Sequence, residues 1–325
     1  MGVDLRLSKD QTKLYDLIAD VTARGEYSFQ VPFAVKKTGL TEFVKIALGD
    51  YPERINYNNT VISYGVRGFK SQIMLHEVFG RGQLSAAKRR FDEETQNILR
   101  RISRPGASDA QKALAIHDYL VGNVVYDIDY SGKASRDILS HTAYGAIVEK
   151  RGVCEGIAFA FSHLAKCMGL KASIISGTAR GGDHSWNIVQ IGADCFHVDA
   201  TWDITFKRTD VYGSYDYFCL SDRELVGRTW DFGLFPPCVS GKYNYFNVTG
   251  SYAHNREQLR SILLKQFLQK GAVYLKCDFL DPDQDAAFNY VWNELVSLAR
   301  EHRFSIGSAT GSVNEELGTI AIFRA

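Results

Sequence analysis

Residues 151–161, RGVCEGIAFAF, place one cysteine directly before a run of apolar residues. The run has the composition of a buried helix, so Cys154 stands where that helix begins. A helix N-terminus favours the thiolate form of cysteine through its unpaired amides and its dipole. Gly152 permits a close approach to the helix, and the backbone N–H of Cys154 points to where an oxyanion forms when an acyl carbon is attacked. The pattern predicts a nucleophilic thiol.

A histidine and an aspartate follow in the order that such a thiol requires. His184 begins the predicted strand in GGDHSWNIV, and Asp199 lies in the next predicted strand, in FHVDATWD. Neighbouring antiparallel strands bring side chains to within about 5 Å of each other. We therefore expect Asp199 to orient His184, and His184 to act as the base for Cys154. The three residues together predict acyl transfer through a thioester.

Each of these residues, taken alone, has a simpler interpretation. A single cysteine near the start of a helix is more often a packed thiol. A histidine or aspartate at a strand end is usually a cap or a surface group. Cys195 and His197 are the rival thiol and the rival base. The order of the three residues in this context favours the catalytic interpretation.

Three other histidines carry weaker signals. His117 and His141 invite a metal site, but no third ligand stands at a workable spacing, so we predict no metal. We expect His117 to face solvent or to bind a nearby carbonyl, and His163 to be hydrogen-bonded within the core. The six cysteines lack C-x-x-C spacing, which disfavours structural zinc. The sequence predicts no cofactor.

Apolar periodicity and turn residues predict the elements that position these side chains. A buried helix after Cys154, followed by strands over 171–179, 185–192 and 195–203, predicts an α+β domain with one helix packed across an antiparallel sheet. Other predicted elements are helices over 8–24, 41–52, 84–102, 108–127, 256–271 and 283–303, strands within 26–33, 59–79 and 272–279, irregular chain over 210–238, and a closing pair of strands over 304–309 and 318–323.

The segment from Lys112 to Asp203 resembles the core of the transglutaminase-like superfamily, in its bacterial branch. The residues that carry the resemblance form five short motifs. They are His117-Asp118-Tyr119-Leu120, Thr142-Ala143-Tyr144-Gly145, Gly152-Val153-Cys154-Glu155-Gly156, His184-Ser185-Trp186-Asn187 and Val198-Asp199-Ala200-Thr201-Trp202-Asp203. The resemblance covers about a third of the chain closely. It implies a papain-like α+β fold, with Cys154 as the nucleophile, His184 as base and later acid, and Asp199 as the group that orients His184.

Animal transglutaminases carry an upstream tryptophan as oxyanion donor and calcium sites. Here the four tryptophans, at positions 186, 202, 230 and 292, all follow Cys154, and no EF-hand loop is present. Tyr144 is the candidate substitute donor, with a core aromatic as its equally weighted alternative. Trp186 and Trp202 follow the triad residues closely, and either wall the cleft against water or are core packing.

Length and charge bound the remaining possibilities. The 325 residues suggest three parts: an N-terminal α/β domain over 1–103, a catalytic core over 104–250 and a small C-terminal α/β domain over 251–325. A net charge of +1 provides no strong global field, so we expect neither nucleic acid nor membrane as a partner. The chain begins without an apolar signal region, which indicates a cytoplasmic protein, with a processed secreted form or a delivered effector as alternatives.

The expected activity is that of a cysteine protease or amidase acting on peptide or protein amides. The triad serves equally for a transglutaminase, which transfers the acyl group to an amine, or for a glutamine deamidase. A binding or scaffold module that has kept the fold without turnover is a further alternative. The sequence does not fix the oligomeric state.

Overall fold

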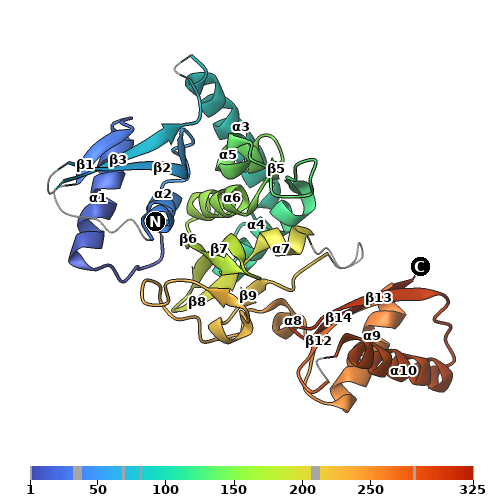
Figure 1. Ribbon diagram of the computed structural model, residues 1–325. Helices are drawn as coiled ribbons and strands as arrows, with labels where there is room; N and C mark the ends of the chain where they lie inside the picture. Colours follow the sequence, from blue (N-terminus) through green and yellow to red (C-terminus); the bar gives the residue numbers. More distant parts are fainter. Residues whose placement is uncertain are drawn as a thin grey trace.

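The computed structural model describes residues 2–31, 39–67, 70–80, 82–205, 213–280 and 283–324, without the side chains of 58–67, 70, 71 and 324. The described residues form sheets of three, five and four strands and the two-stranded β4–β5 sheet. Figure 1 shows the three larger sheets with their helices, in sequence order from the N-terminal to the C-terminal end. The fold is α+β, as the sequence predicts.

The N-terminal part contains a three-stranded antiparallel sheet in the order β1-β3-β2. Ser8 caps the first helix, since its hydroxyl accepts the backbone N–H of Gln11 while the Gln11 side chain accepts that of Ser8. The elements are α1 (Lys9–Ala23), β1 (Ser28–Val31), α2 (Leu40–Gly49), β2 (Tyr57–Arg67), β3 (Lys70–Glu77) and α3 (Leu84–Ile102). The predicted helices and strands of this part are confirmed for the described residues.

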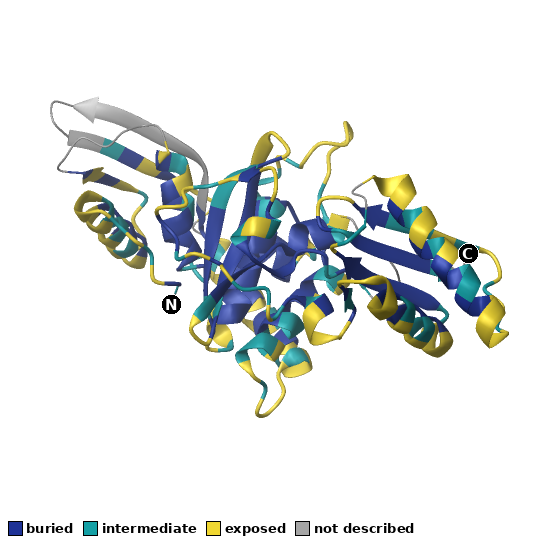
Figure 2. Ribbon diagram, turned by 90° about the horizontal axis from the view of Figure 1, so that it is seen from below, coloured by how far each residue is buried: buried dark blue, intermediate teal, exposed yellow. Residues whose placement is uncertain are grey.

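The central part is built on a five-stranded antiparallel sheet in the order β10-β6-β7-β8-β9, with α6 packed against it. Residues 155–165 of α6 are all buried, and Figure 2 shows the middle of the molecule as largely buried. The elements are α4 (Asp109–Asn123), β4 (Val125–Tyr126), η1 (Ile138–His141), α5 (Ala143–Ile147), β5 (Arg151–Gly152), α6 (Cys154–Cys167), β6 (Lys171–Ala179), β7 (Gly182–Ile191), β8 (Asp194–Val198), α7 (Ala200–Thr205), β9 (Phe218–Leu220), η2 (Asp222–Glu224) and β10 (Arg228–Thr229).

Several predictions of local structure were wrong in detail. The helix expected over 108–127 ends at Asn123, before β4. The strand expected over 195–203 ends at Val198, because the Asp199 carboxylate accepts the backbone N–H of Trp202 and starts α7. The segment expected to be irregular contains the edge strand β9 and the short strand β10, which pairs with β6. The first strand of the closing pair is 309–314 rather than 304–309.

The C-terminal part has its own four-stranded sheet, in the order β11-β12-β14-β13, with two helices packed on it. Its apolar cluster is drawn from these elements alone, with Leu263, Val291 and Ile322 fully buried. The elements are α8 (Tyr245–Val248), β11 (Tyr252–Ala253), α9 (Arg256–Lys270), β12 (Ala272–Cys277), α10 (Gln284–His302), β13 (Ala309–Asn314) and β14 (Thr319–Arg324).

The N-terminal and central parts share one apolar cluster, which runs from Leu14 to Cys219. In that cluster α2 lies against β6, where Gly49 meets the side chain of Ile174. The division into three domains at residues 103 and 250 stays a prediction.

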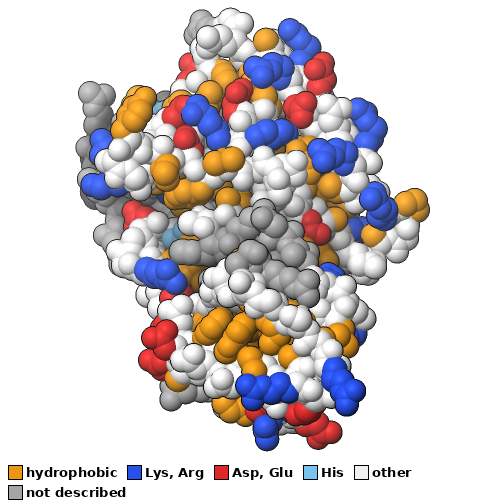
Figure 3. Space-filling view, turned by 90° about the vertical axis from the view of Figure 1, so that its right-hand side faces the viewer, with side chains coloured by type: hydrophobic (Ala, Val, Ile, Leu, Met, Phe, Trp, Pro, Cys, Tyr) orange, Lys and Arg blue, Asp and Glu red, His pale blue; other side chains and the backbone are white. Residues whose placement is uncertain are grey.

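The surface carries both charge signs, and the face in Figure 3 shows basic and acidic side chains interspersed. Within the described ranges, no helix combines the length and apolar character needed to cross a bilayer.

Two glycines let the turn at η1 pack closely on the start of α6. A Cβ on Gly156 would overlap the carbonyl oxygen of Ser140 and lie 2.9 Å from that of Thr142. A Cβ on Gly145, in α5, would likewise overlap the carbonyl oxygen of Leu139. The backbone around Cys154 is therefore fixed from two sides by contacts that only glycine allows.

Gly156→Ala is expected to lower the free energy of unfolding by about 1–3 kcal/mol, because the added methyl must push backbone apart. Gly122, in α4, serves as the control, because a methyl group added there would meet no atom within 4 Å. Gly122→Ala should raise stability by about 0.5–1 kcal/mol, since glycine weakens a helix. Urea unfolding measures both, and equal effects of the two substitutions would contradict this account.

Candidate active site

Cys154 is the first residue of α6 and is half-buried. The preceding residue, Val153, offers no side-chain cap, and its N–H donates to the Ser140 carbonyl at 2.9 Å. The chain enters the helix through β5, which pairs in parallel with β4. The thiol therefore stands at an uncapped helix N-terminus, where the dipole favours an anion.

His184 lies in β7 and joins the other two predicted residues. Its Nε2 is 2.7 Å from Oδ2 of Asp199, and Cys154 lies near enough to raise the pKa of its imidazole. Asp199 engages Nε2, which leaves Nδ1 as the other ring nitrogen of His184. The structure thus brings Cys154, His184 and Asp199 together in the order that the sequence predicts.

The electrostatics of the triad favour a charged imidazole. Burial lowers the pKa of His184, but the charge and hydrogen bond of Asp199 and the hydrogen bond of Cys154 outweigh it and raise that pKa to about 9. Burial raises the pKa of Asp199, but the charges of His184 and Arg228 lower it by more. The pKa of Asp199 therefore lies well below its ordinary range. At neutral pH the site holds an imidazolium between a carboxylate and a sulfur.

Arg228, which the sequence analysis missed, is the second cation on Asp199. Its Nη1 donates to Oδ2 of Asp199 at 2.6 Å, and both side chains are almost fully buried. The segment LVGRTWDF has no apolar periodicity that would predict a helix or a strand. Its one local signal is a basic residue between a glycine and a threonine–tryptophan pair. Its position depends on the pairing of β10 with β6, which is not evident from local sequence.

Trp186 and Trp202 both contact the imidazole of His184. The Trp186 ring stacks on it with centroids 5.8 Å apart, and the Trp202 ring is tilted at 5.5 Å. The Trp186 N–H donates to Nδ1 of His197 at 3.1 Å, so it is already engaged. Both tryptophans wall the imidazole, and Trp186 is not an oxyanion donor.

Tyr144, predicted as a candidate oxyanion donor, packs in the core. Its ring lies 5.0 Å from that of Phe79 and stacks on Phe91 at 6.5 Å. Among the described contacts, none joins it to the triad. The surroundings of Tyr144 fit the alternative interpretation, in which it is an aromatic residue of the core.

Tyr126 is nearer to the chemistry. The parallel register of β4 and β5 pairs it with Gly152, two residues before the thiol. Burial and the charges of Cys154 and Asp199 raise the pKa of its hydroxyl to about 12. The hydroxyl therefore stays protonated and lies within the electrostatic field of both triad residues.

The remaining motif residues support the triad rather than joining it. Asn187 donates from Nδ2 to the Ala158 carbonyl and to the Ser162 hydroxyl, each at 3.0 Å, and so ties β7 to α6. His117, expected to face solvent, is fully buried and pairs with Asp203 at 2.9 Å. The reason is that Asp203, in α7, is itself buried, so an ion pair across α4 and α7 compensates it.

Other titratable residues have structural partners. His141 pairs with buried Glu155 at 3.1 Å, and His163 binds Thr95 at 3.0 Å within the core, as predicted. Burial raises the pKa of Cys195, the rival thiol, to about 11. The rival base, His197, engages Asp222 at 2.8 Å through Nε2 in addition to Trp186.

One group of described residues has metal-ligand atoms near one another. They belong to His197, Asp222 and Cys238 and lie within 4.8 Å. Both nitrogens of His197 are engaged, with Nδ1 accepting from Trp186. Burial holds the pKa of the Cys238 thiol well above its usual range. We assign no metal to this group, because Trp186 and Asp222 already engage both nitrogens of the imidazole.

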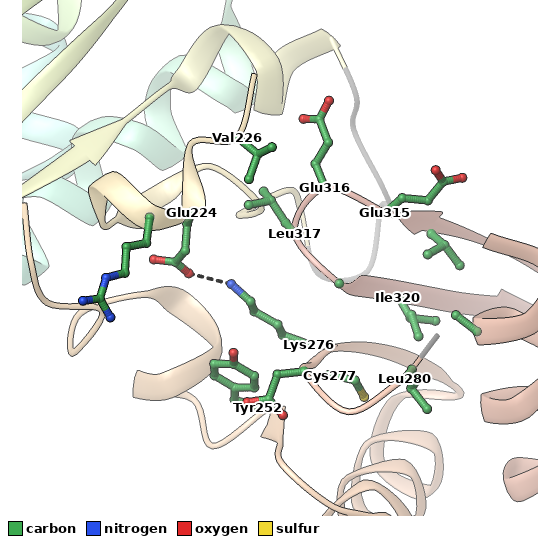
Figure 4. Close-up of a pocket in the computed structure, with 15 residues that line it drawn as sticks. Glu224, Val226, Tyr252, Lys276, Cys277, Leu280, Glu315, Glu316, Leu317 and Ile320 are labelled. Atoms are coloured by element: carbon green, nitrogen blue, oxygen red, sulfur yellow. Dashed lines mark hydrogen bonds and ion pairs between the residues drawn. The ribbon is translucent and has the colours of Figure 1, made fainter. Parts of the chain in front are cut away.

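A cavity of about 310 Å³ lies apart from the triad, between the segment before β10 and the C-terminal sheet. Figure 4 shows Lys276 and Glu224 on one side, and Leu317 and Ile320 on the other. Lys276 and Glu224 form an ion pair at 2.6 Å. Glu316, at the edge of the cavity, also pairs with Arg180 at 3.0 Å.

Comparison with known families now bears on this geometry. Residues 96–202 match the model of the transglutaminase-like superfamily, and the match includes Cys154, His184 and Asp199. Residues 96–202 belong to that superfamily. A comparison with curated proteins finds no match.

Three solved structures resemble the chain at low identity. One is a candidate cysteine protease from Cytophaga hutchinsonii, with 16% identity, a TM-score of 0.29 and coverage of 43% of this chain and 61% of that one. A TGase has 14% identity, a TM-score of 0.32 and coverage of 57% and 54%. A candidate protease from Parabacteroides distasonis has 9% identity, a TM-score of 0.25 and coverage of 42% and 35%. The chain thus spans between about a third and three fifths of the length of these proteins.

Asp199→Asn should lower the pKa of His184 from about 9 to below its ordinary value of 6.5, since burial, the largest influence, then acts without the carboxylate. In the wild type, the charged imidazole stabilises the fold fully below pH 6.5, and this contribution is lost as the pH rises through about 9. An NMR titration of the histidine Cε1–H signals, assigned with a His184→Gln variant, measures the shift. An unchanged midpoint in a folded Asp199→Asn protein would contradict the coupling.

Proposed function

We propose that this protein is a thiol acyl-transfer enzyme, and specifically a cysteine protease or amidase that hydrolyses peptide or protein amides. The observation that carries the proposal is the buried arrangement in which His184 binds Asp199 at 2.7 Å and interacts electrostatically with Cys154 at the start of α6. The membership of residues 96–202 in the transglutaminase-like superfamily supports the same class of chemistry.

The chemistry follows from the two protonation states of His184. The Cys154 sulfur attacks the amide carbon, and the carbonyl electron pair moves to oxygen. When the intermediate collapses, the C–N bond breaks and His184 gives its proton to the leaving amine, which leaves a thioester. Neutral His184 then takes a proton from water, the resulting hydroxide attacks the thioester, and the carboxylic acid and the Cys154–His184 pair are released.

The developing oxyanion has two candidate donors. One is the backbone N–H of Cys154 at the uncapped start of α6. The other is the hydroxyl of Tyr126, which burial and the field of Cys154 and Asp199 keep protonated. Tyr126 thus takes the role for which the sequence nominates Tyr144.

Hydrolysis is favoured over amine transfer, because no tryptophan precedes Cys154 to take the oxyanion role found in cross-linking enzymes. The N-terminal and C-terminal parts contribute no catalytic residue to the proposal, and we assign them to positioning or recognition of the substrate.

Iodoacetamide labelling compares two thiols of opposite character. Cys167 is exposed but unactivated, since burial of its sulfur and nearby Glu53 raise its pKa. Cys154 is less exposed, yet its sulfur lies beside an imidazolium. Near pH 6 we expect Cys154 to react at least about tenfold faster than Cys167 and the four buried thiols. Peptide mass spectrometry over a time course gives the rates.

Labelling in order of exposure alone, with Cys167 first, would count against an activated nucleophile. A His184→Gln variant is the control, because it should bring the rate at Cys154 down to that of an ordinary thiol. The scaffold alternative predicts that Cys154→Ala leaves the cellular effect of the protein intact.

Acyl acceptors are separated with a glutamine-containing protein and a fluorescent amine, beside a peptide library. We expect new peptide termini, no incorporated amine and no product with Cys154→Ala. Tyr126→Phe should lower kcat about 10²-fold with little change in KM, as for loss of one oxyanion donor. Tyr130→Phe, on the exposed loop after β4, is the matched control. Amine incorporation without cleavage would instead identify a transglutaminase, and an unchanged kcat for Tyr126→Phe would remove that donor.

A further inference from the structure

Arg228 occupies a slot formed by three aromatic rings beside the triad. Its guanidinium carbon lies 4.1 Å from the ring centroid of Trp202 and 5.2 Å from those of Trp186 and Tyr217. Its Nη1 binds Asp199, while Nη2 is buried without a hydrogen-bond partner in the part of the chain that the structure describes. An unpaired buried N–H is costly, and the π faces compensate it in part. Because the buried Nη2 of Arg228 costs free energy and is not paired, we expect the charge of Arg228 to have a function.

The backbone that carries Arg228 is fixed by the sheet. Arg228 pairs with Ala179 and Thr229 with Thr178, and the two threonine hydroxyls lie 2.6 Å apart. Gly177, directly opposite His184 in the β6–β7 pairing, has no side chain to obstruct the Thr229 carbonyl. The same strand, β6, therefore sets the positions of both cations on Asp199.

We propose that Arg228 is a positioning residue for the active site, whose permanent charge holds Asp199 ionised whatever the protonation state of His184. This inference rests on the proposed function. When His184 gives its proton to the leaving amine, its positive charge disappears, and a carboxylate buried beside neutral imidazole alone would be uncompensated. A guanidinium stays protonated at all pH values relevant to folding, so the compensation persists through the cycle.

Arg228 also shares Oδ2 of Asp199 with His184. It therefore competes for the carboxylate and repels the imidazolium, which makes the proton of His184 easier to transfer. The other titratable groups that interact with Arg228 or with the triad include Cys154 from α6, Tyr126 from β4, His197 from β8 and Tyr217 before β9. None of these groups carries a permanent positive charge, whereas Arg228 does.

Arg228→Gln keeps an N–H donor for Asp199 and removes the charge. We expect the pKa of His184 to rise by about one unit above its wild-type value, since an adjacent cation shifts such groups by about that much. Arg228→Lys should keep the wild-type value. Arg180→Gln is the matched control, because Arg180 lies on the Trp202 ring at 4.6 Å but pairs with Glu316 rather than with Asp199. The histidine NMR titration measures all four proteins, and an unchanged pKa in folded Arg228→Gln overturns the proposal.

If Arg228→Gln does not fold, the double variant Asp199→Asn/Arg228→Gln removes both buried charges together and leaves neither uncompensated. Its His184 pKa should exceed that of Asp199→Asn alone, and equal values overturn the proposal. The titration needs no substrate, so it is independent of the proposed activity. A shifted His184 with uniform labelling of all six thiols would refute the acyl chemistry and leave the role of Arg228 intact.

Discussion

The site depends on one buried carboxylate. Asp199 is 2% exposed, and a lone charge in such a place is strongly unfavourable. Three groups make it tolerable: the imidazole of His184, the guanidinium of Arg228 and the backbone N–H of Trp202. They come from three separate elements, so ionising Asp199 requires the sheet, α7 and the segment around β10 to be in place at once. The charge and the tertiary structure support each other.

A second buried ion pair holds the element that begins after Asp199. Asp203, one turn further along α7, binds His117 of α4, the Ser214 hydroxyl and the backbone N–H of Tyr217. Replacing such a pair by apolar residues often costs little, so its presence is weak evidence for stability alone. Its consequence here is geometric. The pair fixes the direction of α7. It thereby also fixes the side chain of Asp199, the residue directly before α7, which binds His184.

The sequence was sufficient for whatever is encoded locally. Ser8 and Ser108 mark the starts of their helices, since each forms a capping box. The residues after Cys154 are buried, as their apolar character indicates. The order of thiol, imidazole and carboxylate also sufficed to predict that they meet. Arg228 could not be predicted in this way, because it is 29 residues from Asp199 and reaches it only through the β10–β6 pairing. The same limit explains the two tyrosines: Tyr144 is closer to Cys154 in sequence, but Tyr126 is placed beside it by the β4–β5 register.

The aromatic rings around the triad explain why these charges act strongly. Trp186 and Trp202 cover the imidazole, and Trp202 also contacts the guanidinium groups of Arg228 and Arg180. Rings that displace water lower the local dielectric, so each charge–charge interaction among Asp199, His184 and Arg228 is larger than it would be at the surface. Arg180 is in turn held by Glu316 of the C-terminal part. The Trp202 ring is thereby linked, through Arg180, to a part of the chain that contributes no member of the triad, which gives that part a physical connection to the chemistry.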